Sequence, residues 1–240
     1  MSAIPEGIEY HLPIDLSLVM SWLAVSIIVL ISWLGTRRLA KVPAGLQNLL
    51  EWVLGIITDF ADDLVGPTAP RYYPLFAMLF FFILVSNLMG LVPGLVSSTS
   101  RLSTTAGLAL IVFVATHYFG IRERGLWNYI KRWFGPVPTW LKPFMFFIEI
   151  MGELARPLSL AFRLFGNILA KEILLGVLAL LVVIFLPSGN VIQEALSVVP
   201  IILRPLIILL GLLVSVIQAF VFMILAMVYI GGAVQAHSGH

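Results

Sequence analysis

The stretch "ARPLSLAFRLFGNILAKEILLG", residues 155–176, decides the fold of this chain. It is apolar enough for a membrane helix, yet it carries Arg156, Arg163, Lys171 and Glu172. A charged side chain near the middle of a bilayer costs about 2.5–3.5 kcal/mol on insertion scales. Four such residues in one segment therefore indicate ion pairing, access to water or a function inside the membrane.

The chain as a whole has the composition of an integral membrane protein. Of its 240 residues, 60% are hydrophobic and 11% are charged, and the mean hydropathy is +1.06, far outside the averages for soluble domains. A net charge of +2 is too small to indicate nucleic-acid binding. The absence of cysteine excludes a disulfide framework and cysteine-ligated metals. The spacing of His11, His117, His237 and His240 matches no metal site, so we expect no metal and no other cofactor.

Apolar runs predict an all-α integral membrane protein of about five to six helices, with residues 1–240 as a single membrane domain. Ahead of the long C-terminal stretches we expect spans at 16–34, 72–92 and 104–121 and an amphipathic helix at 43–66. The amphipathic segment has one apolar and one polar face, which is typical of a helix lying in the membrane interface.

Basic residues in two loops predict the orientation of the chain. The loop "TRRLAK" follows the first span, and the loop after the third contains a further cluster of arginines and lysines. Because cytoplasmic loops carry the excess of positive charge, both loops are predicted to be cytoplasmic. Counting spans then places the N-terminus outside and the C-terminus in the cytoplasm.

Two unusually long apolar stretches, 143–186 and 195–234, form the predicted C-terminal hairpin. As a continuous helix the first would be about 66 Å long, roughly twice the hydrocarbon thickness of a bilayer. It either breaks near Pro157 or Gly176 and spans twice, or it is one strongly tilted helix. The sequence leaves both possibilities open.

A polar stripe follows one face of the first long stretch. At 100° per residue, this face gathers most polar side chains within about 80° of Arg163, and Glu172 falls on the opposite side; the stripe consists of Glu149, Glu153, Arg156, Ser159, Asn167 and Lys171. Arg156 either pairs with Glu149 or Glu153 or has a function, and Lys171 is expected to snorkel to the interface. Arg163 has no acidic residue three or four positions away, so its partner must come from another helix or another chain.

Three motifs carry a resemblance to a known family. The segments "SNLMGLVP", "PLSLAFRLFGN" followed by "ILAKE", and "IQAFVFMILAMVYI" resemble subunit a of the F-type ATP synthase, over about residues 43–232. The resemblance implies a stator subunit of the membrane sector in the bacterial inner membrane. Its implied partners are the c-subunit ring, peripheral-stalk subunit b, the remaining ATP synthase subunits and membrane lipid. The chain has no Gly-rich nucleotide loop, so we do not expect it to be an enzyme by itself.

The same resemblance implies roles for individual residues. Arg163 would face the carboxylate of each passing c subunit and separate two ion half-channels, a task that suits a guanidinium because it does not lose its proton. The outside half-channel would use Asn167, Glu172 and Gln218, and the cytoplasmic one Glu149 and Ser159. Gln218 could instead hydrogen-bond across the hairpin, and Asn87, which also matches a family position, is expected to be structural.

Two positions depart from the family pattern. Several relatives have a histidine where this chain has Gly211 and an aspartate where it has Arg101, so we expect Glu172 to act with water and without a histidine partner. Two other classes of protein remain open, a secondary transporter or channel and a membrane anchor without ion chemistry. Transporter folds often contain internal repeats, which this sequence lacks, and an anchor does not explain the stripe around Arg163.

Overall fold

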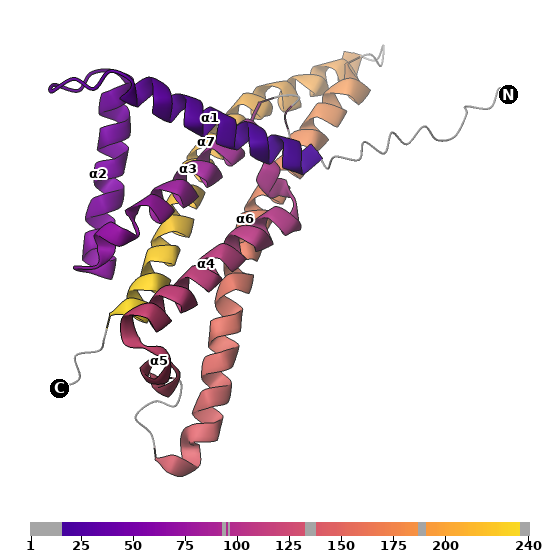
Figure 1. Ribbon diagram of the computed structural model, residues 1–240. Helices are drawn as coiled ribbons and strands as arrows, with labels where there is room; N and C mark the ends of the chain where they lie inside the picture. Colours follow the sequence, from indigo (N-terminus) through magenta and orange to yellow (C-terminus); the bar gives the residue numbers. More distant parts are fainter. Residues whose placement is uncertain (1–15, 93–94, 96, 133–137, 187–190, 236–240) are drawn as a thin grey trace.

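The computed structural model describes residues 16–92, 95, 97–132, 138–186 and 191–235. Within these residues the chain forms seven α-helices and three short 3-10 helices, and no strand. The α-helices are α1 (Leu16–Thr36), α2 (Leu46–Val65), α3 (Tyr73–Met89), α4 (Leu102–Arg124), α5 (Leu126–Arg132), α6 (Lys142–Phe185) and α7 (Val191–Val234) (Figure 1). The all-α class is confirmed, and the short α5 is an addition that the sequence pattern did not predict.

Four of the helices are long and apolar enough to cross a membrane, namely α1, α4, α6 and α7. The apolar α3 has 17 residues and is somewhat shorter. Helix α2 does not belong to this set, and its buried residues Ile57, Ala61 and Val65 recur every four positions. That spacing marks a helix with a single packed face, and its place at the membrane interface stays a prediction.

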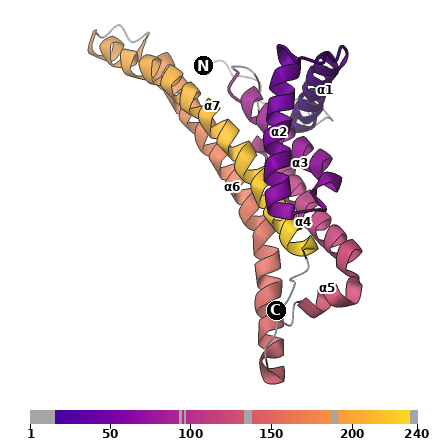
Figure 2. The same cartoon turned by 90° about the vertical axis from the view of Figure 1, so that its left-hand side faces the viewer.

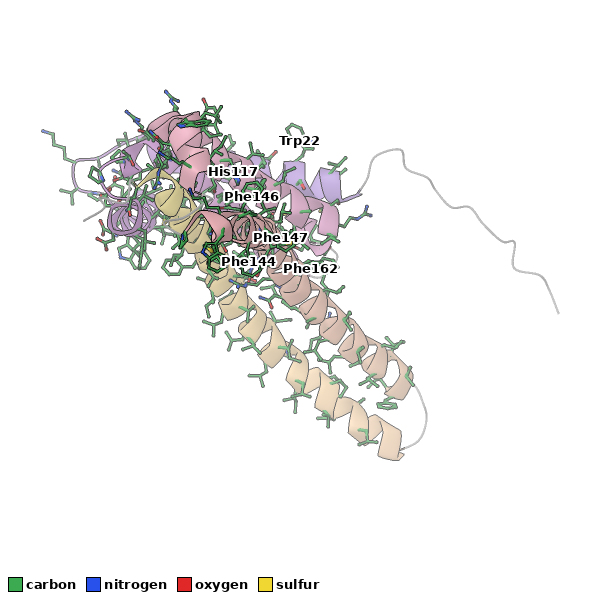
Figure 3. All side chains as sticks on the ribbon, turned by 90° about the horizontal axis from the view of Figure 1, so that it is seen from below. Trp22, His117, Phe144, Phe146, Phe147 and Phe162 are labelled. Atoms are coloured by element: carbon green, nitrogen blue, oxygen red, sulfur yellow. The ribbon has the colours of Figure 1, made fainter. Side chains whose placement is uncertain are left out.

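Helices α6 and α7 form the C-terminal hairpin, and each is continuous over 44 residues. Pro157 lies inside α6 without ending it, so a break at Pro157 or Gly176 does not occur. At about 66 Å, such a helix fits a bilayer of about 30 Å only if it runs obliquely. Figure 2 shows the hairpin extending as an arm beyond the other helices, and Figure 3 shows its two helices side by side from below.

The core of the bundle is built around the C-terminal half of α7. Its inward side chains are completely buried, with α2, α3, α4 and α6 packed around them; they include Ala219, Phe222, Met223, Ala226, Met227 and Ile230. Gly231 lies so close to α2 that a Cβ atom there would be 2.4 Å from the carbonyl oxygen of Leu64. Arg124 of α4 also donates a hydrogen bond of 3.1 Å to the carbonyl of Gly232. These contacts fix the inner half of α7 in the bundle.

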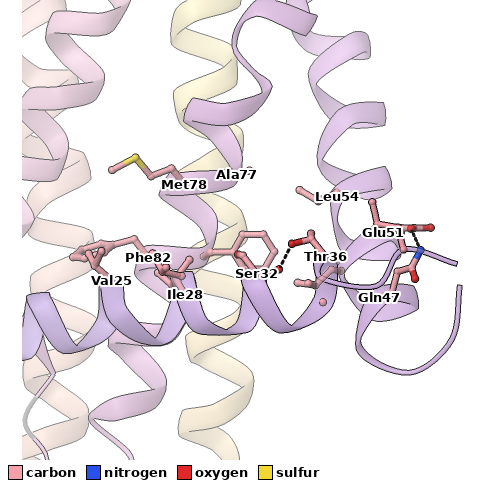
Figure 4. Close-up of a pocket in the computed structure, with 15 residues that line it drawn as sticks. Val25, Ile28, Ser32, Thr36, Gln47, Glu51, Leu54, Ala77, Met78 and Phe82 are labelled. Carbon is pink, nitrogen blue, oxygen red and sulfur yellow. Dashed lines mark hydrogen bonds between the residues drawn. The ribbon is translucent and has the colours of Figure 1, made fainter.

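A separate apolar groove of about 520 Å³ lies between α1, α2 and α3 (Figure 4). At one end Gln47 donates to Glu51 at 2.7 Å, and its side-chain amide also pairs with the backbone of Ala40. Of the described residues that line the groove, none belongs to α6 or α7. The groove is therefore distinct from the charged stretch of α6.

Candidate ion-translocation site

Arg163 lies on the open face of the hairpin. Its side chain is exposed and makes no hydrogen bond or ion pair with any residue that the structure describes, whereas the next residue, Leu164, is fully buried. Ser159, one helical turn earlier, is also exposed. Helix α6 thus turns its apolar side toward the bundle and presents the guanidinium outward. The sequence predicted that any partner of Arg163 lies elsewhere, and this geometry leaves the charge available to another molecule.

Two polar contacts join α6 to α7 just beyond Arg163. Asn167 Nδ2 donates to Gln218 Oε1 at 2.6 Å, and Lys171 Nζ donates to Ser215 Oγ at 3.2 Å. Gln218 thus makes the hydrogen bond across the hairpin that was considered for it. At 1.5 Å per residue, this polar ladder extends about 12 Å along α6 from Arg163. The sequence analysis did not identify Ser215 as a site residue. It lies near Gly211 and Gln218, which with Arg204 recur every seven residues.

Lys171 does not snorkel, contrary to expectation, because only 9% of it is exposed. Its ammonium has a buried partner in Ser215, and its stem fills the space beside Gly211. A Cβ atom at Gly211 would lie 3.0 Å from Lys171 Cδ and 2.8 Å from Leu91 Cδ2. The space beside Gly211 is thus occupied in this chain by the lysine side chain.

Glu172 faces away from the Arg163 stripe, toward the connection between α3 and α4. It lines a cavity of about 340 Å³ together with residues of that connection and Arg204 of α7. Its Oε1 is buried and has no hydrogen-bond partner among the described residues. Glu172 therefore lies between an open cavity and the polar ladder that starts at the adjacent Lys171.

The two residues predicted for the cytoplasmic half-channel are not brought together. Ten residues separate Glu149 from Ser159, which is about 15 Å along one helix. Glu149 is half-buried and Ser159 is exposed on the face of Arg163. Glu149 and Ser159 are therefore not in direct contact.

A partly buried ion pair lies in the N-terminal third of α6. Arg156 Nη1 donates to Glu153 Oε1 at 2.8 Å, and its guanidinium lies 5.5 Å from the ring centre of Tyr229. Of the two partners predicted for Arg156, Glu153 is the one observed. The pair borders a cavity of about 10 Å³, room for about one water molecule. Nothing in the sequence around Tyr229 signalled this contact.

A buried cluster of hydroxyl and amide groups lies at the C-terminal end of α3. Ser97, Ser98 and Thr99 are fully buried, and Thr99 Oγ1 donates to Asn87 Oδ1 at 2.9 Å. Asn87 is thus part of a packed network, in line with its expected structural role. From the sequence, the run "SSTS" predicted only a turn.

The described residues contain no group of three or more histidine, aspartate or glutamate side chains that could hold a metal ion. His117 Nδ1 lies 2.9 Å from the carbonyl oxygen of Phe113. The site consists instead of charged and amide side chains placed along apolar helices.

An oblique hairpin that carries arginine, lysine and glutamate within its apolar length defines a class, the polytopic membrane proteins that move ions. Comparison with known proteins gives the family within that class. The profile of the family described as ATP synthase A chain matches residues 18–231, and the chain belongs to this family.

Three similar proteins are bacterial. ATP synthase subunit a of Geobacter sulfurreducens is 42% identical over 90% of this chain and 86% of its own length. ATP synthase subunit a 1 of Syntrophotalea carbinolica is 47% identical over 90% of this chain and 84% of its own. The corresponding protein of Geotalea uraniireducens is 42% identical over 92% and 87%.

Family membership establishes the general role of the chain. It is a non-catalytic, proton-translocating subunit of the ATP synthase membrane sector, and other ATP synthase subunits are its partners. The resemblance seen in the sequence motifs is confirmed. The secondary-transporter and anchor readings no longer apply.

Proposed function

We propose that this chain provides two proton half-channels that meet the c-subunit ring on either side of Arg163, and so couples proton flow to rotation and ATP synthesis. One observation carries the proposal. Arg163 faces outward from one side of α6, while Glu172 faces a cavity of about 340 Å³ on the other side, and a polar ladder joins the two regions.

The outside half-channel runs from that cavity to the open face of the hairpin. A proton enters the cavity, binds Glu172, and then passes through water held by the groups of the ladder, Lys171 with Ser215 and then Asn167 with Gln218. Gln218 Nε2 and Glu172 Oε1 have no hydrogen-bond partner among the described residues, which suits groups that bind water in a proton path. The path ends one helical turn from Arg163.

Arg163 acts as both barrier and partner of the ring carboxylate. A positive charge within a few ångströms favours the ionised form of a carboxylate and so promotes release of its proton. The guanidinium does not deprotonate under working conditions, so it does not conduct protons between the half-channels. A ring carboxylate that leaves Arg163 must bind a proton before it enters lipid, because a bare charge there is unstable.

The cytoplasmic half-channel uses the other end of α6. Ser159 lies on the face of Arg163, and Glu149 lies farther toward the end that the positive-inside rule assigns to the cytoplasm. The Glu153–Arg156 pair neutralises charge along this part of the helix. The partners on the open face are the c-subunit ring and, elsewhere on the chain, peripheral-stalk subunit b. The protein lies in the bacterial inner membrane with its N-terminus outside and its C-terminus in the cytoplasm.

The proposal is tested by Arg163→Ala in the complete, reconstituted ATP synthase. ATP-driven acidification and passive proton leak are measured in the same vesicles. We expect acidification to be lost and leak to rise with a normal complement of subunits. Arg122→Ala is the control, because this exposed arginine lies in the last turn of α4 and outside the hairpin, and it should neither stop acidification nor open a leak. Normal acidification in the Arg163→Ala complex would overturn the proposal.

A further inference from the structure

We propose that the groove between α1, α2 and α3 binds one phospholipid that carries an amine in its headgroup. One acyl chain lies between the three helices, and the headgroup lies at the connection between α1 and α2, residues 37–45. Of the described lining residues, none belongs to α6 or α7. The site is therefore separate from the proposed half-channels and stands whatever the roles of Arg163 and Glu172.

The size and lining of the groove suit an acyl chain. Its volume of about 520 Å³ lies within the range of about 300–1,000 Å³ that is typical of pockets for small organic ligands. Most of the lining side chains are apolar, and the chain itself leaves several of them uncovered, since Val29, Leu39 and Met78 are 61%, 70% and 63% exposed. A continuous exposed apolar surface of this kind marks a binding site.

The length of the groove matches one leaflet of a bilayer. On α1 its lining runs from Val25 to Thr36, which is about 16 Å along the helix axis, and on α3 it includes only the N-terminal part, from Ala77 to Phe82. Half of a hydrocarbon core of about 30 Å is about 15 Å. A membrane-spanning helix of another subunit would cover α1 over the whole thickness, so the short lining favours a lipid chain.

The polar groups of the groove are gathered at one end. Figure 4 shows Gln47 and Glu51 at this end and Val25 at the other. Gln47 Oε1 accepts a hydrogen bond of 3.1 Å from the N–H of Ala40, and Gln47 Nε2 donates to Glu51 Oε1 at 2.7 Å. Glu51 is thus tied to the α1–α2 connection, where a headgroup would lie above an acyl chain in the groove.

The charges at this end complement a headgroup with both a phosphate and an ammonium. Arg37, Arg38 and Lys41 are exposed and form no ion pair with any residue that the structure describes. Basic side chains bind phosphate through charge-assisted hydrogen bonds, and the exposed Glu51 carboxylate can accept from an ammonium. A headgroup that carries only negative charge would instead be repelled by Glu51. The groove therefore favours phosphatidylethanolamine over phosphatidylglycerol.

The test is photolabelling of the complete ATP synthase in vesicles that contain equal amounts of these two phospholipids. The probe is phosphatidylethanolamine with a diazirine at the end of one acyl chain, and the labelled peptides are mapped by mass spectrometry. We expect the label on α1 and α3 around Val25 and Phe82, at the apolar end of the groove. Phosphatidylglycerol with the same diazirine should label this region about fivefold less, the effect of one charge near a membrane surface.

One pair of variants tests the acyl-chain part of the site. Met78→Trp fills the groove from α3 and should remove most of the label from α1. Leu110→Trp is the matched control, because Leu110 is 58% exposed on α4 and does not line the groove, and it should leave the label unchanged. Label spread evenly over the exposed helices, or label on α1 that persists in Met78→Trp, overturns the proposal.

A second pair tests the headgroup part, and it decides alone if Met78→Trp does not assemble. Arg37→Gln combined with Arg38→Gln should lower the label about fivefold for each arginine removed. Arg122→Gln combined with Lys131→Gln removes the same charge from exposed positions on α4 and α5 and should have no effect. Equal losses in the two double variants overturn the proposal.

Two further measurements address the choice of occupant. Glu51→Gln should abolish the preference for the ethanolamine headgroup, and equal labelling of the parent by the two lipids would show that the headgroup assignment is wrong. A photoreactive amino acid at Val29 should crosslink to lipid. If it crosslinks to another ATP synthase subunit instead, a protein helix fills the groove and the proposal is overturned.

Discussion

The two halves of α7 have similar apolar sequences and opposite surroundings. In the inner half, from Ala219 onward, the inward side chains are fully buried by four other helices. In the outer half, large apolar residues such as Ile202 and Leu209 are 67% and 65% exposed. The inner half is buried by its own chain, and the outer half is a surface that lipid or another subunit covers. Hydropathy alone does not distinguish the two, because both read as membrane helix.

The polar contacts of the candidate site lie at the boundary between the two halves of α7. Ser215 and Gln218 are at the boundary, and their partners on α6 lie between Arg163 and Glu172. Ser215 and Gln218 are buried against α6, whereas Arg163 and Asn167 are exposed on α6. The buried half of α7 therefore anchors the hairpin on which Arg163 is exposed.

We expect the largest loss of stability from a substitution of Gly231, in the buried half of α7. A methyl group at Gly231 would lie 2.4 Å from a backbone oxygen of α2, which cannot move aside without shifting the helix, whereas nothing lies within 4 Å of a Cβ atom at Gly232. We expect Gly231→Ala to destabilise the subunit by about 3 kcal/mol, which reduces the amount found in membranes and its unfolding temperature.

Gly232→Ala is the control, and it should change stability by less than about 1 kcal/mol, with a gain favoured by the helix propensity of alanine. The two variants differ by one position in the same turn, so expression and insertion signals are nearly identical. Equal stability of the two would mean that α7 is not clamped on α2 as described.

A smaller effect is expected at the boundary, for Gly211→His. The new side chain must displace Leu91 and the Lys171 stem, both of which can move, so we expect a loss of about 1–2 kcal/mol and reduced ATP-driven pumping as Lys171 leaves Ser215. Adding Lys171→Ala should recover much of the stability, which a double-mutant cycle measures as a coupling between the two positions. Additive losses would show that lysine and glycine do not share this space.

The sequence predicted the architecture well because burial in lipid leaves a strong signal. The length of the apolar runs and the charges between them indicate helices and loops directly. The angular arithmetic also separated Glu172 from the Arg163 stripe, since both lie on one continuous helix and helical geometry is regular.

The contacts of the site were less accessible from sequence, because they depend on the register between distant segments. Nothing local pairs Lys171 with Ser215, 44 positions away, and a lysine in a membrane helix is more often one that snorkels. The buried cluster around Ser97 was hidden for the same reason, since a Ser-rich turn looks like solvent-exposed chain until its fold shows the side chains turned inward.

We expect the smallest effect on the stability of the subunit from a substitution of Ile217, in the exposed half of α7. This residue is 51% exposed and adjoins Gln218, whose bond to Asn167 places it about one turn from the level of Arg163. Ile217→Ser should alter the stability of the isolated subunit by no more than about 0.5 kcal/mol, yet weaken retention of the c-subunit ring when the complex is purified in detergent.

Ile230→Ser, at a fully buried position of the same helix, should do the reverse, destabilising the subunit by about 3 kcal/mol through a cavity and a buried hydroxyl. Because the substitution is the same, the pair tests environment alone. If Ile217→Ser leaves ring retention unchanged, this part of the open half faces lipid, and the surface that meets the ring must be sought on the α6 side of Arg163.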